Sequence, residues 1–341
     1  MNSTYSLPDR LSGRKEYRVL RMLLSTACTV WSCATDRQLG VLIFHRVRPH
    51  RDPLFPGEPD RAQFTAAMEV VANCFNCVPL DQALQCVASG RSLPKRAVAI
   101  TFDDGYADNF TEALPVLQQY GLTATFFIAS GFLDGGCMWN DEAVEAIRAF
   151  WKSEIDLTPL GLGISPCRTI DEQVATIKRV KDHLKYQTPT ARRETLDILR
   201  DITGAAKLPR LMLSSEQVRT MHSLGMGIGG HTVNHPILAC MDDEAAMREI
   251  REDRDRLTAI TGAAPTLFAY PNGKPGKDYG LQHVAMVRAV GYRAAFTTVW
   301  GVTSPGADMF QLPRFSPWDR QPMRFALRLA HNYTRDHFQL A

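Results

Sequence analysis

AVAITFDDG, residues 97–105, is the stretch that decides the fold. Its first six residues are apolar or β-branched, as in a buried strand, and two aspartates and a glycine follow directly. A helical pattern then runs from Asn109 to Tyr120, and Gly121 ends it. A strand that leads into a helix is the repeating unit of parallel α/β sheets, whose functional residues gather at the carboxyl ends of the strands.

The same unit recurs on both sides of this stretch. Upstream, the pattern predicts a strand at 40–44, a loop at 48–60, a helix at 60–75, a short strand at 78–80 and a helix at 81–88. Downstream, it predicts strands at 123–129, 227–230, 266–270 and 292–298 and helices at 214–224, 242–260 and 281–290. We therefore expect parallel strands with right-handed crossovers, in an open sheet or a closed (β/α) barrel.

Residues 140–205 break this rhythm. They are charged and helical throughout, and no part of them has the pattern of a strand, so we interpret them as an inserted helical subdomain. The barrel is expected to span 39–320 with this insertion, and a C-terminal helix or tail is expected at 321–341.

The first 38 residues are read as an N-terminal helical segment. Four basic residues precede an apolar run at 22–34, which also has features of a signal sequence. The run is diluted by serine and threonine and is shorter than the about 20 residues of a membrane span. We therefore favour an interfacial helix and expect a peripheral contact with a membrane surface.

Composition limits the function classes. The chain has 341 residues and 45% hydrophobic content, enough for a large core. Its net charge of +3 is small and scattered, so no nucleic-acid partner is expected. The eight cysteines lack the paired spacing of a zinc knuckle and are read as reduced thiols. A cytoplasmic or membrane-peripheral location is therefore favoured over secretion.

Asp103 and Asp104 place two adjacent carboxylates just past a strand end. Neighbouring carboxylates do not both stay ionised cheaply unless a cation lies beside them. A metal ion would resolve that conflict. The alternative is an ordinary helix-capping turn, because aspartate is common at such junctions.

His231 and His235 follow another strand of the same sheet, so they are expected at the same edge as the aspartates. Their four-residue spacing lets both imidazoles reach one ion, and Pro236 argues for a turn in place of a helix. One carboxylate and two imidazoles leave open positions around a divalent ion for water and a substrate carbonyl, and the other aspartate remains to accept a proton. The alternative is two surface histidines in a loop.

Three motifs resemble, in order, those of the polysaccharide deacetylases, carbohydrate esterase family 4, with its NodB-like homology domain. They are Thr101-Phe102-Asp103-Asp104-Gly105, His231-Thr232-Val233-Asn234-His235 and Tyr270-Pro271-Asn272-Gly273. The resemblance covers roughly residues 39–315 and implies a distorted (β/α)₇ barrel, in agreement with the alternation above.

The resemblance also implies the roles of the motif residues. Asp103 would be the general base, and Asp104, His231 and His235 would hold the metal. The ion expected is Zn²⁺, with Co²⁺ or Ni²⁺ as alternatives. Tyr270 to Gly273 would shape the pocket floor, where a backbone N–H helps to hold an oxyanion, although the same residues also suit a simple turn.

Two features depart from the family pattern. The third motif commonly begins with an arginine that orients the base, and this chain has none in 267–271. Arg314 could supply that charge from a neighbouring position. The alternative is a surface arginine paired with Asp308 or Asp319.

The general acid is the second departure. The family's usual histidine stands in a Leu-x-His motif, and the match here, ending in His331, falls in a helical stretch. His45 is the better candidate, because Phe44-His45-Arg46-Val47 resembles the element from which biofilm-polysaccharide deacetylases supply the acid. An acid that titrates near pH 7 suits this role. Trp139 and Trp318 are expected near the site, either stacking on sugars or packing.

These observations together predict a metal-dependent hydrolase that removes N-acetyl groups from an N-acetylglucosamine-type polysaccharide or oligosaccharide. Two alternatives remain. One is a small-molecule amidase on the same barrel, since the motifs fix the bond type and not the acyl carrier. The other is a non-catalytic glycan-binding relic in a polysaccharide assembly system, in view of the missing arginine and the displaced acid.

Overall fold

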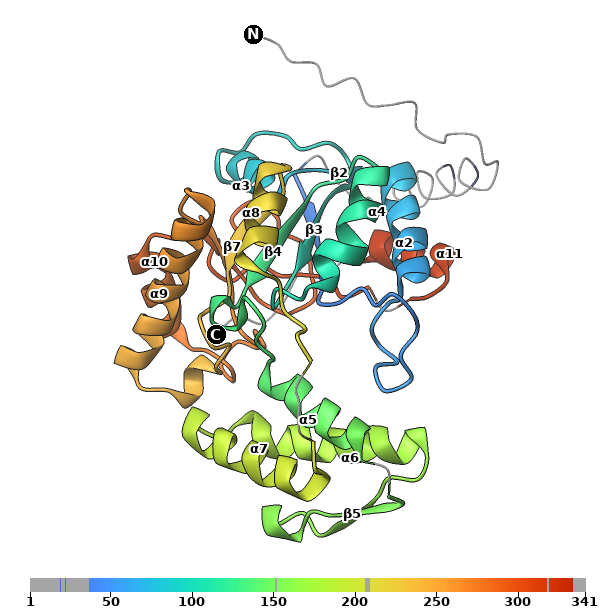
Figure 1. Ribbon diagram of the computed structural model, residues 1–341. Coiled ribbons are helices and arrows are strands. Elements are labelled where there is room, and N and C mark those ends of the chain that lie inside the picture. Colours follow the sequence, from blue (N-terminus) through green and yellow to red (C-terminus); the bar gives the residue numbers. More distant parts are fainter. Residues whose placement is uncertain are drawn as a thin grey trace.

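The computed structural model describes residues 19, 22, 37–150, 152–205, 209–317 and 319–333. Within this part, seven strands form one parallel sheet at the centre of the barrel (Figure 1). Six of them follow one another in the order β1 (Leu39–Phe44), β3 (Ala97–Phe102), β4 (Ala124–Ile128), β7 (Gly227–Gly230), β8 (Leu267–Ala269) and β9 (Ala294–Phe296). The two-residue strand β2 (Asn76–Cys77) pairs with β3.

The segment 312–315 closes the gap between the outer strands β9 and β1. The Leu312 N–H donates to Ala295 O on the β9 side at 2.9 Å, and the Phe315 N–H donates to Val41 O on the β1 side at 2.7 Å. The strands therefore curl into the distorted (β/α) barrel that the alternation and the family resemblance predicted.

Helices cover the outside of this barrel (Figure 1). They are α2 (Arg61–Cys74), α3 (Leu80–Ala88), α4 (Leu114–Gln119), α8 (Ser215–Ser223), α9 (Asp243–Thr261), α10 (Leu281–Val290) and α11 (Pro322–Asn332). Local sequence signals set their ends. Asp60 and Gln63 form a capping box at the start of α2, and Gly262 ends α9 in the left-handed conformation.

Two predicted boundaries were wrong for reasons that involve proline. The strand predicted at 78–80 lies at 76–77, because Pro79 is the N-cap of α3 and ends the strand. The helix predicted from Asn109 begins as a π-helical turn, Asn109–Ala113, before α4. Pro115 lacks the N–H with which a regular helix would pair residue 111.

The insertion forms a separate lobe on one side of the barrel (Figure 1). It contains α5 (Trp139–Ala149), α6 (Ile170–Lys185), α7 (Pro189–Thr203) and an antiparallel pair, β5 (Glu154–Asp156) and β6 (Ile164–Pro166). The prediction that it has no strand was wrong. Only the central residue of each strand is buried, so no apolar run marks them in the sequence. The lobe has its own apolar core, which Leu54 from the 48–60 loop completes.

Both chain ends lie largely outside the described residues. Of the predicted N-terminal helical segment at 1–38, the structure describes only residues 19, 22, 37 and 38. The tail at 334–341 also lies outside the described residues. In the described part, no helix is both long and apolar enough to cross a membrane. Cys167 is a buried free cysteine, and Cys86, Cys137 and Cys240 are half-buried free cysteines.

Candidate active site

The predicted site residues meet at the carboxyl ends of the strands. Asp103 and Asp104 follow β3, and His231 begins the turn that follows β7. Six described residues other than glycine have a left-handed φ, and four of these lie at this edge: Asp104 (76°), Thr232 (66°), His235 (49°) and Asn272 (59°). Such backbone conformations are costly, and they cluster where a functional geometry is held in place.

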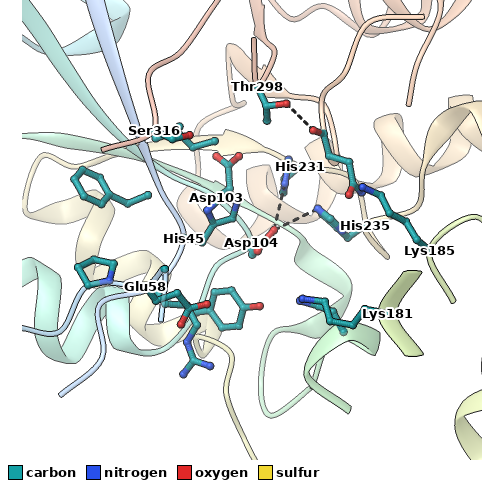
Figure 2. Close-up of a pocket in the computed structure, with 18 of the residues that line it drawn as sticks. His45, Glu58, Asp103, Asp104, Lys181, Lys185, His231, His235, Thr298 and Ser316 are labelled. Carbon is teal, nitrogen blue, oxygen red and sulfur yellow. Dashed lines mark hydrogen bonds and ion pairs between the residues drawn. The ribbon is translucent and has the colours of Figure 1, made fainter. Parts of the chain in front are cut away.

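Asp104, His231 and His235 converge on a common point. Asp104 Oδ1 lies 3.4 Å from His231 Nε2 and 3.3 Å from His235 Nε2 (Figure 2). One ligand atom from each side chain lies within 4.8 Å of the other two. Asp104 and His231 are buried and His235 is nearly so. A divalent cation with carboxylate and imidazole ligands fits this spacing.

The hydrogen bonds around these side chains also fit a cation. His231 Nδ1 lies 2.7 Å from Ala269 O, so Nδ1 donates its proton there and the Nε2 lone pair faces Asp104. Asp104 Oδ1 and His235 Nδ1 are buried, and neither has a hydrogen-bond partner among the described residues. Buried polar atoms are rarely left without a partner, and a cation at this point would satisfy the carboxylate oxygen.

Charge and burial set the protonation states of the three groups. Burial would raise the pKa of Asp104, but the two imidazoles hold it well below its ordinary value. Burial lowers the pKa of His235 to about 4, although Asp104 acts in the opposite direction. His235 is therefore neutral at pH 7. A neutral imidazole has the lone pair that a metal ligand needs.

Asp103 is held by the closing segment of the barrel. Arg314 is fully buried, and its Nη1 and Nη2 donate to the two oxygens of Asp103 at 2.6 and 2.7 Å. Its Nε donates to Thr297 O at 2.9 Å. Burial would raise the pKa of Asp103, but the guanidinium outweighs burial and holds the pKa below its ordinary value.

The surface alternative for Arg314 is wrong. Asp319 pairs instead with Arg328, and Asp308 accepts hydrogen bonds from Gln311 and from the Phe310 N–H. The arginine that the third motif lacks is thus replaced by a side chain from another segment, which reaches the predicted base.

A pocket of about 590 Å³ lies between the barrel and the insertion, and its lining includes Asp103, Asp104, His231 and His235. In Figure 2, His45 and Glu58 lie on one side of it, and Lys181 and Lys185 of α6 lie on the other. Trp139, at the start of α5, lines the pocket and also packs against the insertion core, with the Arg192 guanidinium 4.6 Å from its ring centre. Trp318 lies outside the described residues.

The two candidates for the general acid are in different places. His45 lines this pocket and is exposed to solvent at its mouth, and Asn109 Nδ2 donates to its carbonyl oxygen at 2.8 Å. His331 lies on α11, where it lines a different hollow with Trp300 and Arg324. Only His45 lies beside the predicted base.

Within the third motif, only Asn272 lines the pocket. Tyr270 is fully buried, and its hydroxyl donates to Phe310 O at 3.0 Å. The Tyr270 N–H donates to Phe296 O, and the Gly273 N–H to Pro271 O, while Pro271 has no N–H. The expected oxyanion contact is therefore not available from Tyr270, Pro271 or Gly273, because their backbone groups are used within the fold.

Sequence reasoning missed Asp253 of α9, which supports the turn that begins at His231. This fully buried carboxylate accepts from the His231 N–H at 2.9 Å and from the Ser130 N–H at 3.2 Å. A Cβ on Gly230 would lie 2.8 Å from Asp253 Oδ2, so a glycine there allows this approach. The signal was present, because Asp253 stands at helical spacing on the buried face of α9.

Comparison with known proteins agrees with the motifs. The family model described as polysaccharide deacetylase matches residues 90–157 and 168–295, more than half of the chain. YxkH of Bacillus subtilis (strain 168), which bears the name of a polysaccharide deacetylase, is 20% identical over 278 residues, which cover 81% of this chain and 70% of YxkH. The poly-beta-1,6-N-acetyl-D-glucosamine N-deacetylase of Escherichia coli (strain K12) is 32% identical over 74 residues, which cover 22% of this chain and 11% of that protein.

Solved structures agree on the fold. The Streptococcus pyogenes deacetylase PplD in complex with acetate matches with a TM-score of 0.57 and 17% identity, over 87% of this chain and 99% of that one. The three motifs lie inside the residues that the family model matches, whereas His45 and Arg314 lie outside them. The chain belongs to the polysaccharide deacetylase family, and it is a deacetylase enzyme.

Proposed function

We propose that this enzyme removes N-acetyl groups from an N-acetylglucosamine-type polysaccharide with the help of a divalent ion held by Asp104, His231 and His235. One observation carries the proposal. Asp104 Oδ1 lies within 3.4 Å of both imidazole Nε2 atoms, while the adjacent Asp103 is kept ionised by Arg314. A carboxylate and two imidazoles suit Zn²⁺, and Co²⁺ or Ni²⁺ would fit the same donor set.

When bound, such an ion polarises an amide carbonyl and lowers the pKa of water beside it. The protein's own groups then act on the protons. Asp103 accepts the proton of the attacking water, because Arg314 stabilises its ionised form. His45, at the pocket mouth, donates a proton to the departing amine nitrogen. Asn272 contacts the substrate in this proposal, which its position in the pocket lining supports. The products are acetate and a sugar with a free amine.

The substrate class is supported by the relatives. The matched Escherichia coli protein is named for poly-beta-1,6-N-acetyl-D-glucosamine, although its similarity covers only a short part of it. We also assign the chain to the subgroup whose first strand ends in His-Arg-Val, because His45 follows β1 and faces the pocket. The arginine whose absence favoured a non-catalytic relic is supplied by Arg314, which weakens that alternative.

The direct test is acetate release from N-acetylglucosamine oligomers with added Zn²⁺, Co²⁺ or Ni²⁺. Asp103→Asn is expected to keep its metal and lose about 10²- to 10⁴-fold in kcat, because the amide cannot accept the proton. Asp201→Asn, an exposed position on α7, is the matched control and should retain full activity. Release from small acetamides but from no glycan would favour the amidase alternative, and full activity of Asp103→Asn would refute the base assignment.

The acid assignment is tested by comparing the two histidines. His45→Ala is expected to lower kcat by about 10²-fold while metal content stays unchanged, because the leaving amine is then not protonated. His331→Ala should behave like the wild type. The opposite result, a loss of turnover only in His331→Ala, would move the acid to α11.

A further inference from the structure

Two lysines of the insertion face the candidate active site. Lys181 and Lys185 stand one turn apart on α6, and both line the pocket that contains Asp104 and His235. Figure 2 places them across the pocket from His45 and Glu58. Both side chains are half-buried. The wall that the insertion adds to the barrel is therefore basic at this point.

Each acidic group of the same pocket lies beside another side chain, and Asp104 lies against the imidazoles of His231 and His235. Glu58 pairs with Arg48 at 2.5 Å, and Asp182 pairs with Lys178 at 2.6 Å. Asp103 forms an ion pair with Arg314. Among the described residues, no carboxylate oxygen lies within ion-pair distance of either pocket lysine. In the described part of the chain, neither ammonium therefore has a direct ion-pair partner, and the Lys185 ammonium lies 5.5 Å from the centre of the Tyr186 ring.

This arrangement does not stabilise the fold. Like charges four residues apart on a helix are mildly destabilising. Burial lowers the pKa of Lys185, and the nearby Lys274 and Lys277 lower it further, against the opposing effect of Asp278. An anion bound in the pocket would relieve both the repulsion and the desolvation.

We propose that Lys181 and Lys185 bind an acidic group, a carboxylate or a phosphate, on a sugar next to the one that is deacetylated. The natural substrate is then an anionic N-acetylated glycan. This inference rests on the proposed function, because the acetamide is taken to lie at Asp104, His231 and His235. A lysine ammonium is a strong point charge, and its interaction with an anion is screened by salt.

The test is equilibrium binding to metal-stripped protein, so that no turnover occurs. The first probe is an oligosaccharide of alternating N-acetylglucosamine and glucuronate, and its matched control is the methyl ester of the same oligosaccharide. A third probe with a phosphate monoester in place of the carboxylates distinguishes the two acidic groups. The variants are the double substitution Lys181→Gln with Lys185→Gln, and Lys95→Gln, an exposed lysine before β3 at the opposite end of the barrel.

The wild type is expected to bind an acidic probe about tenfold more tightly than the ester at low ionic strength, and the preference should shrink with added salt. The double variant should lose this preference, and Lys95→Gln should keep it. Equal affinity for acid and ester, no binding of any probe, or an unchanged preference in the double variant would overturn the proposal. Acetate release from neutral oligomers by metal-loaded wild type tests the deacetylase assignment separately.

Discussion

At the scale of single residues, the pair of Asp103 and Arg314 controls the candidate base. The two side chains are 211 positions apart in the sequence and form a bidentate contact in a fully buried place. A guanidinium matches both carboxylate oxygens at once and stays charged when buried. The contact therefore fixes the orientation of Asp103 as well as its charge.

Arg314→Lys tests this contact, because an ammonium keeps the positive charge but cannot make the bidentate contact of a guanidinium with both oxygens of Asp103. We expect kcat to fall by about 10- to 100-fold, with little change in KM, since the base is misoriented. Arg328→Lys, in the pair with Asp319, is the matched control. If kcat of Arg314→Lys stayed within twofold of the wild type, the bidentate contact would not be needed to orient Asp103.

At the scale of elements, a buried polar network joins α5 of the insertion to the barrel. Tyr106, after the Asp103-Asp104 motif, donates its hydroxyl proton to Asp141 at 2.9 Å. Arg46, next to His45, pairs with Asp108 at 2.7 Å and lies 3.9 Å from Asp141. Since Asp141 belongs to the first turn of α5, this network sets where the insertion meets the pocket.

The network makes stability depend on pH. Burial raises the pKa of Asp141 to about 7, so the folded chain holds this proton more tightly than the unfolded chain, whose carboxyl titrates near 4. The resulting stabilisation is complete below about pH 4 and is lost as the pH rises to about 7. Asp141→Asn does not titrate, and its amide oxygen still accepts from Tyr106.

We therefore expect the wild type to lose stability relative to Asp141→Asn as the pH rises. The free energy of unfolding of the variant minus that of the wild type should increase by about 3 kcal/mol from pH 5 to pH 8. Denaturant unfolding at several pH values measures this difference. Asp201→Asn should show no such trend, because its carboxyl is exposed. A constant difference between Asp141→Asn and the wild type would contradict the raised pKa.

The elements also show what the sequence could and could not predict. Strands β3 and β4 were predicted almost to the residue, because a strand buried on both faces is a continuous apolar run. The hairpin of β5 and β6 was missed because its strands bury one residue each. The segment 312–315 closes the barrel through isolated bridges, which leave no periodic pattern in the sequence.

At the scale of the whole molecule, the barrel brings three sequence motifs to one edge. Parallel strands end together, so the convergence of Asp104, His231 and His235 could be predicted once the alternation was recognised. The contribution of the insertion to the pocket could not be predicted from the sequence. Which of its residues line the pocket, such as Lys181 and Lys185, depends on how its lobe packs against the barrel. Asp253 could have been found from its place on the buried face of α9.

The metal content of the purified protein tests the central claim most directly. After dialysis against excess Zn²⁺ and removal of the unbound ion, we expect about one ion per chain in the wild type and in His183→Ala, an exposed histidine of α6. Asp104→Ala, His231→Ala and His235→Ala should each bind more than about 100-fold more weakly, since each removes a direct ligand. Unchanged zinc content in any of these three variants would contradict the account.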